Sequence, residues 1–197
     1  MTGDLETLRV YDTQAGEYAR LTAHSVDDPL LAAFIAALPP GARVLDLGCG
    51  PGGMAALMAQ SGLQVDATDA SGEMVALAAA HPGVNATQAS FDQISGTALY
   101  DGIWANFSLL HAPRHAMPRH LAALKTALKP GGLFHIALKS GEGEKRDRLG
   151  RYYTYYSADE LTGLLVAAGF TVASHATGSD KGLDGSVADW IALAAHG

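Results

Sequence analysis

The chain has 197 residues, of which 48% are hydrophobic; this is enough for one ordinary core, and no apolar run is long enough to span a membrane. Twenty Asp and Glu against thirteen Lys and Arg give a formal net charge of −7, which would repel a nucleic acid backbone. The single cysteine excludes an internal disulfide and a thiolate-cluster metal site, so we expect one domain without metal, nucleic acid or membrane partners.

From the N-terminus onward, the pattern is that of an α/β protein. Residues 1–6 carry acids before any apolar run, which is atypical of a secretory or transit signal and favours a cytoplasmic location. Apolar residues with helical period predict an amphipathic helix over 26–38. Short apolar strands, separated by Ala- and Leu-rich helical stretches, follow at about 43–47, 64–68, 84–89, 101–106 and 132–139. Parallel neighbours need crossovers, so this alternation predicts a parallel sheet with helices on both faces.

The last third of the chain has a different pattern. The segment Ser157-Ala158-Asp159-Glu160 has the form of a capping box and predicts a helix that continues to Ala168 and ends at Gly169. Two strands predicted near 170–177 and 188–195 have only a short glycine-bearing loop between them. That loop is too short for a parallel crossover, so we expect these strands to form an antiparallel hairpin at one edge of the sheet.

The first strand runs into a glycine turn, RVLDLGCGPGG. Gly48, Gly50 and Gly53 have the G-x-G-x-x-G spacing of a turn that holds a nucleotide at a helix N-terminus. Asp46, however, would repel a pyrophosphate, and Pro51 lacks the N–H group that a phosphate cradle uses. A ligand with an ammonium or sulfonium group and no phosphate suits both residues, and S-adenosylmethionine is such a ligand.

An acid also ends the second predicted strand. Asp69 lies about 20 residues beyond the glycine turn, where a carboxylate can accept both ribose hydroxyls of an adenosine ligand. Dinucleotides and S-adenosylmethionine both need this group, so Asp69 supports adenosine without choosing between them. The alternative is a solvated acid that caps a helix beginning near Ser71.

Four segments, VLDLGCGPGG, VDATDAS, YDGIWANFSLLH and LKPGGLFHIALK, resemble in order and spacing the class I (Rossmann-like) S-adenosylmethionine-dependent methyltransferases. The resemblance covers about residues 40–195, including the terminal hairpin. It implies an α/β fold with a seven-stranded, mostly parallel sheet of order 3-2-1-4-5-7-6, the last strand antiparallel, and helices on both faces. It further implies an enzyme that binds S-adenosylmethionine over the carboxyl ends of the strands.

The resemblance assigns the methionine part of the cofactor to the glycine turn, the ribose to Asp69 and the adenine to residues beyond it. Most members have an acid where this chain has Ser90, so the Phe91 backbone or Asp92 would substitute in gripping the adenine amino group. Tyr11 and Tyr18 lie where many members fold an N-terminal lid, although a packed role suits either residue equally. The predicted cofactor-binding residues are Tyr18, Asp46, Gly48, Cys49, Gly50, Asp69, Ala70, Met74, Ser90, Phe91, Asp92, Asn106 and Phe107.

Methyl transfer is an in-line displacement at a sulfonium, so the protein mainly aligns the acceptor and excludes water. An acceptor hydroxyl needs a general base, for which His111 is the candidate, although it could equally pack at the start of the next helix. His111, His115 and His120 have no accompanying carboxylate or thiolate, which argues against a metal site. The sequence Ala105-Asn106-Phe107-Ser108 lacks the Pro-Pro-aromatic pattern of base and glutamine N-methyltransferases, which argues against N-methylation of adenine. With neither an appended domain nor a basic face, we expect a small-molecule acceptor.

Residues 140–156 contain glycines, charges and four tyrosines, with no predicted regular element; loops of this length are usually functional or disordered. We interpret them as a lid over the acceptor, with Arg151 (or Arg148) binding a carboxylate and Tyr152 and Tyr155 lining the pocket. The alternative is an aromatic ledge packed on the last helix. The single predicted domain thus comprises an N-terminal helical lid (1–40), a cofactor-binding core (41–139), this loop, and a C-terminal helix and hairpin (157–197).

Two other functions stay open at this stage. An NAD-dependent oxidoreductase would need a hydride-transfer site, and no Tyr-x-x-x-Lys pair occurs in the chain. A catalytically silent S-adenosylmethionine-binding module would share the same motifs, and only turnover distinguishes it. The acceptor, the methylated atom and the oligomeric state do not follow from the sequence.

Overall fold

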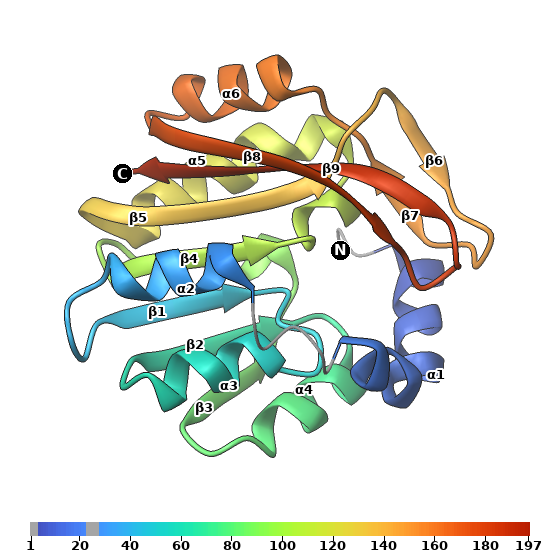
Figure 1. Cartoon of the computed structure of the whole chain (residues 1–197), viewed down its shortest axis with the longest axis horizontal. Helices are drawn as coiled ribbons and strands as arrows, with labels where there is room; N and C mark the ends of the chain where they lie inside the picture. The colour runs from blue at the N-terminus through green and yellow to red at the C-terminus, as the bar shows by residue number, and fades with distance from the viewer. Residues whose placement is uncertain (1–3, 23–27) are drawn as a thin grey trace.

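In the computed structural model, which describes residues 4–22 and 28–197, the chain folds around a seven-stranded sheet (Figure 1). The strands of this sheet are β1 (Arg43–Leu47), β2 (Gln64–Asp69), β3 (Val84–Gln88), β4 (Tyr100–Asn106), β5 (Leu128–Lys139), β8 (Thr171–Lys181) and β9 (Val187–His196). They lie in the order β3-β2-β1-β4-β5-β9-β8, with β1 to β5 parallel and β9 antiparallel to both of its neighbours. Counted within this sheet alone, the order is 3-2-1-4-5-7-6, so the predicted fold class is confirmed.

Helices cover both faces of the sheet (Figure 1). One face carries α2 (Pro29–Ala36), α3 (Gly53–Gln60) and α4 (Gly72–Ala79), and the other carries α5 (Met117–Ala127) and α6 (Ala158–Ala167). Side chains of β1 alternate between the two cores: Val44 packs under the first group of helices, while Leu45 and Leu47 pack under the second. Asp46 is buried as well, an unfavourable place for a carboxylate that lacks a partner.

Side-chain caps set the starts of α6 and α2, both of which the sequence predicts as helices. Ser157 caps α6 by accepting a hydrogen bond from the backbone N–H of Glu160 at 3.2 Å, as its sequence predicts. The helix predicted over 26–38 is found as α2, and Asp28 caps its first turn. The first two predicted positions of that helix lie outside the described residues.

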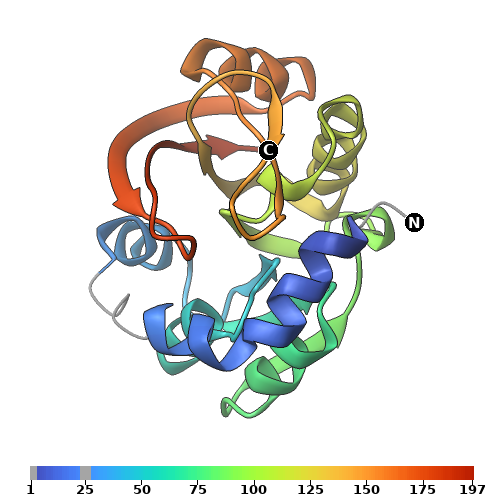
Figure 2. The same cartoon turned by 90° about the vertical axis from the view of Figure 1, so that its right-hand side faces the viewer.

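Three segments lie beyond the carboxyl ends of the parallel strands (Figures 1 and 2). They are α1 (Leu5–Thr22), the hairpin of β6 (Glu144–Arg146) and β7 (Tyr152–Thr154), and the loop 182–186 between β8 and β9. The sequence predicts no regular element over 140–156, but the structure forms the hairpin there. Strands of only three residues are too short to produce a recognisable alternation.

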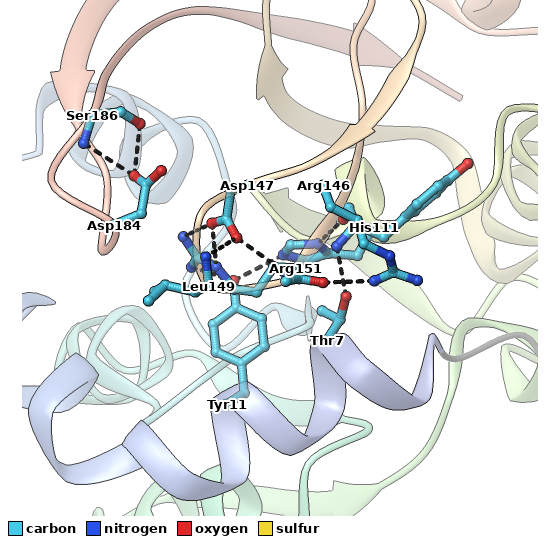
Figure 3. A network of polar contacts seen from close by, with 11 residues as sticks. Thr7, Tyr11, His111, Arg146, Asp147, Leu149, Arg151, Asp184 and Ser186 are labelled. Carbon is cyan, nitrogen blue, oxygen red and sulfur yellow. Dashed lines mark hydrogen bonds and ion pairs between the residues drawn. The ribbon is translucent and has the colours of Figure 1, made fainter.

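Helix α1 runs across this edge of the sheet and is fastened to the hairpin by polar contacts (Figures 2 and 3). The Asp4 carboxylate pairs with the Arg146 guanidinium at 2.7 Å, and Arg146 holds the pKa of Asp4 well below its usual range. The Thr7 hydroxyl oxygen accepts a hydrogen bond from the backbone N–H of Tyr152 at 2.8 Å. Across the part of the chain that the structure describes, no helix is both long and apolar enough to cross a membrane.

A buried histidine fixes a side chain at the end of β4. The His135 ring stacks on Trp104 with centroids 3.6 Å apart, and its Nε2 lies 3.1 Å from the Asn106 Oδ1. The Asn106 oxygen can only accept, so Nε2 carries the hydrogen and orients the amide. Burial lowers the pKa of His135 to about 3.

We predict that His135→Phe reduces the loss of stability in acid. The unfolded chain binds a proton at this histidine below its ordinary pKa of about 6.5, whereas the folded chain binds it only near pH 3. The free energy of unfolding should therefore fall as pH is lowered through this window, by up to about 1.4 kcal/mol per pH unit. Phenylalanine keeps the stack on Trp104 and removes that proton. Urea unfolding of both proteins across the window measures the slopes, and parallel curves would contradict the assignment.

Candidate active site

The chain leaves β1 through a glycine turn that packs closely against neighbouring backbone. Gly48 and Gly50 have φ angles of 70° and 53°, a left-handed conformation that glycine adopts without strain. A Cβ atom on Gly48 would lie 2.3 Å from the Cβ of Ser108, in the loop after β4. The Gly48 N–H donates to the carbonyl of Thr68 at 2.7 Å, which ties the turn to β2. The left-handed φ angle and the close approach of Ser108 each require glycine at position 48.

The Asp69 carboxylate lies at the end of β2 and holds this turn. Its Oδ2 accepts the backbone N–H of Gly50 at 2.9 Å, and its Oδ1 accepts that of Ser71 at 2.9 Å. A carboxylate has about four lone-pair sites, so these bonds leave capacity for a further donor. Burial raises the pKa of Asp69, and the three backbone hydrogen bonds, to Ser71, Gly50 and Ala70, oppose that rise.

A cavity lies over the glycine turn, with α1 forming its outer wall, and we call it the first cavity. It brings together all of the predicted cofactor-binding residues except Asp46, Cys49 and Asp92. The residues that line it are Asp4, Thr7, Leu8, Tyr11, Tyr18, Gly48, Gly50, Asp69, Ala70, Met74, Ser90, Phe91, Asn106, Phe107, Ser108 and His111.

The three exceptions lie outside the lining of this cavity for different reasons. Cys49 is buried within the turn, and burial raises the pKa of its thiol, so it is not a reactive group. Asp92 lies in the short helix η2 (Phe91–Gln93) and pairs with Arg119 at the surface. Asp46 lies beneath the turn and is only 3% exposed.

Asp46 is a buried acid with one unsatisfied oxygen. Among the described residues, its Oδ2 has no hydrogen-bond partner. Burial, reinforced by the nearby negative charge of Asp69, raises the pKa of Asp46 to about 7. A positive charge near these two acids would lower that pKa, whereas a phosphate would raise it further.

His111 lies in the short helix η3 (Leu109–His111) and takes part in a polar network (Figure 3). Its Nδ1 lies 2.7 Å from the carbonyl oxygen of Tyr152, so Nδ1 carries the hydrogen and Nε2 of the neutral ring carries a lone pair. The Tyr11 hydroxyl, 2.8 Å away, donates to that lone pair and accepts from Arg151 Nη1 at 3.2 Å. Removal from water, with a contribution from nearby cations, lowers the pKa of His111 to about 4. The ring is therefore a neutral proton acceptor at physiological pH.

A second cavity adjoins the first and shares Tyr11, Tyr18, Phe107 and His111 with it. Arg151 lines the second cavity from beneath, but its guanidinium is 2% exposed and already paired with Asp147. Tyr152 and Tyr155, the other predicted acceptor residues, are outside the linings of both cavities, and Tyr155 packs in the core together with Tyr153 and Tyr156. The four tyrosines of residues 152–156 thus do not form a single wall of the second cavity.

The three histidines that the sequence places near one another do not converge. His115 is exposed, while His120 is buried and its ring lies edge-on to Phe91 with centroids 5.8 Å apart. Within residues 4–22 and 28–197, no three His, Cys, Asp or Glu side chains are arranged to hold a metal ion.

Sequence reasoning missed part of the first cavity. Thr7 and Leu8 of α1 line it on the same helix face as Tyr11, together with Asp4 just before the helix, and helical spacing from Tyr11 is the signal that points to them. Ser108 directly follows Phe107 in the fourth motif, and its hydroxyl oxygen has no hydrogen-bond partner among the described residues.

Comparisons with known proteins agree on one family. A trans-aconitate 2-methyltransferase from Deinococcus radiodurans is 35% identical over 114 residues, which are 56% of this chain and 43% of that protein. A ubiquinone biosynthesis O-methyltransferase from Xanthomonas campestris pv. campestris is 36% identical over 106 residues, 50% of this chain and 43% of that protein. The matched segments span less than half the length of these relatives.

Among solved structures, a 1,6-didemethyltoxoflavin-N1-methyltransferase from Burkholderia thailandensis, with 1,6-didemethyltoxoflavin and S-adenosylhomocysteine bound, has a TM-score of 0.79. It is 26% identical, and the alignment covers 98% of this chain and 86% of that one. Residues 18–175 match the family described as "Methyltransferase domain", which is most of the chain. The fold, the four motifs and this match agree, and the chain belongs to the methyltransferase domain family.

Proposed function

We propose that this protein transfers a methyl group from S-adenosylmethionine to a small-molecule acceptor. The observation that carries the proposal is the first cavity, in which the glycine turn and Asp69 form one wall while Asp46 lies buried beneath the turn. The Burkholderia relative, which matches nearly the whole chain, binds S-adenosylhomocysteine and a small molecule together. The acidic net charge and the single buried cysteine favour a cytoplasmic enzyme without a nucleic acid substrate.

The residues present fit this cofactor. Asp69 keeps acceptor capacity beyond its backbone hydrogen bonds for a ribose hydroxyl, and the Ser108 hydroxyl in the same cavity has no partner among the described residues. The unsatisfied Asp46 oxygen offers negative charge to a ligand that carries an ammonium and a sulfonium. When bound, S-adenosylmethionine supplies a methyl group on that sulfonium. A pyrophosphate would meet Asp46 and Asp69 as like charges, so NAD is the poorer fit.

The neighbouring network can receive the proton of an acceptor. As an acceptor hydroxyl attacks, its proton would pass to the Tyr11 oxygen while the Tyr11 proton moves to Nε2 of His111. Arg151 donates to the same Tyr11 oxygen and would stabilise negative charge there. The carbonyl of Tyr152 holds the ring in the tautomer that this transfer needs.

An acceptor screen tests the proposal. The protein with S-adenosylmethionine is offered phenols, carboxylic acids and amines, and S-adenosylhomocysteine formation is measured. Turnover with at least one class is expected. Binding of S-adenosylhomocysteine without any turnover would favour a silent binding module, and tighter binding of NAD than of S-adenosylhomocysteine would refute the cofactor assignment.

Asp69→Ala should weaken S-adenosylhomocysteine binding by about 1.5–3 kcal/mol, the range for hydrogen bonds to a charged group. The matched control is Asp66→Ala in the same strand, because Asp66 pairs with Arg43 at the opposite end of β2. Titration calorimetry measures both affinities. Equal affinities for the two variants would remove Asp69 from the site.

Binding of S-adenosylmethionine should strengthen as pH rises through about 7, the raised pKa of Asp46, because the cationic ligand favours the ionised acid. Just below that pH, binding should release up to one proton, which calorimetry in buffers of different ionisation enthalpy detects. Asp46→Asn should abolish the release and weaken binding, while adenosine, which lacks both cations, should bind the two proteins alike. Proton release that persists in the variant would point to another group.

His111→Gln should lower kcat for hydroxyl acceptors by about 10²–10⁴-fold, the usual contribution of a general base. Acceptors that attack as carboxylates need no base and should lose far less. Steady-state kinetics on the acceptors found in the screen separate the two classes. An equal loss for both would mean that His111 positions the acceptor instead of accepting its proton.

A further inference from the structure

The second cavity adjoins the first, so an acceptor bound in it would lie next to a cofactor bound in the first. It is bounded by α1, the end of β5, the β6–β7 hairpin and the β8–β9 loop, and it joins the first cavity at Tyr11, Phe107 and His111. If the cofactor occupies the first cavity, a molecule in the second has its path to the cofactor along these shared residues. The inference below therefore rests on the proposed function.

Most of the charged side chains around the second cavity are either paired with another residue or exposed to solvent. The Arg151 guanidinium donates to Asp147 Oδ2 through Nε at 2.8 Å and Nη2 at 2.6 Å. Asp180 is exposed and accepts from the Trp190 indole N–H at 2.6 Å. Glu17 and Lys181 are exposed at the rim. These groups do not require a ligand to satisfy them.

Lys139, the last residue of β5, is different. Its Nζ lies 4.1 Å from the centre of the Tyr153 ring, and it makes no hydrogen bond or ion pair with any described residue. Two acids are near enough to influence it, Asp184 and Asp147. Asp147 pairs with Arg151, whereas Asp184 accepts only from the neutral N–H and hydroxyl groups of Ser186 and keeps its charge (Figure 3). Burial, together with the positive charge of Arg151, lowers the pKa of Lys139. The ammonium thus lines the cavity without a direct ion pair among the described residues, and Asp184 is the nearby acid that keeps its charge.

The same tyrosine ring links Lys139 to the network around His111. The His111 ring lies 4.7 Å from the Tyr153 ring, centre to centre, so both residues contact one aromatic side chain. A small molecule held at Lys139 could reach the junction of the cavities with its other end. We propose that the acceptor carries a carboxylate, which Lys139 binds, and that its methyl-accepting atom lies beside His111.

This assignment differs from the sequence-based prediction that Arg151 binds the acceptor carboxylate. Arg151 is enclosed and neutralised by Asp147, whereas Lys139 is only partly buried and unpaired among the described residues. The positive charge of Lys139 also contributes to the low pKa of His111. A carboxylate on Lys139 would offset that charge and make His111 a better proton acceptor when the acceptor is in place.

The test uses the full chain saturated with S-adenosylhomocysteine. It is titrated with 4-hydroxybenzoate, 4-hydroxyphenylacetate and succinate, and with the neutral amide of each. At least one carboxylate should bind about tenfold or more tightly than its amide, as a charge-assisted contact requires. Lys139→Met should abolish this preference, and Lys139→Arg should retain it. The matched control Lys181→Met, at the exposed rim of the same cavity, should keep it as well.

The outcomes separate this inference from the proposed function. Failure of the parent protein to bind S-adenosylhomocysteine would refute the proposed function itself. Normal S-adenosylhomocysteine binding with no carboxylate preference, or with a preference that survives Lys139→Met, would overturn the Lys139 assignment alone. Thermal unfolding and S-adenosylhomocysteine affinity of Lys139→Met should match the parent, so that a lost preference reports the missing charge.

Discussion

The hydrogen bonds of the Asp69 carboxylate set the geometry of the carboxyl edge. This one side chain accepts from the glycine turn on one oxygen and from the start of α4 on the other, so it joins β1, β2 and α4. The turn places Gly48 in close contact with Ser108, so the loop after β4 packs directly on the turn. The acid that would bind a ribose is thus also the acid that organises the floor on which the ribose would lie.

The two cavities differ in their buried charges. Asp69 lines the first cavity and Asp46 lies buried beneath its glycine turn, whereas the second cavity is lined by Lys139 and the buried Arg151 together with exposed residues of both signs. Two buried acids without a cation and a partly buried ammonium without a direct ion pair are each unfavourable. A cationic ligand on one side and an anionic one on the other would relieve both.

The sequence pattern predicts a parallel sheet with a terminal hairpin, because these features depend on period and turn chemistry over contiguous residues. The strand order and most residues of the glycine-turn cavity are implied by the family resemblance of the four motifs. Residues 144–154 escape this reasoning, since β6 and β7 are held by distant partners such as Thr7. The prediction that Arg151 binds the acceptor carboxylate did not consider Asp147. This acid lies four residues earlier, in the loop between β6 and β7, and forms an ion pair with Arg151. Lys139 closes the LKPGGLFHIALK motif, yet only the fold reveals that no acid pairs with it among the described residues.

Helix α1 gives both cavities a common wall, because Tyr11 and Tyr18 line each of them. Ligands bound in the two cavities would share these side chains, and any difference in how one ligand places them would link the two binding equilibria. Such linkage is reciprocal: if S-adenosylhomocysteine changes the affinity for the acceptor by some factor, the acceptor changes the affinity for S-adenosylhomocysteine by the same factor. An enzyme built this way would show product inhibition that depends on how much acceptor is present, through one helix and without any second regulatory site.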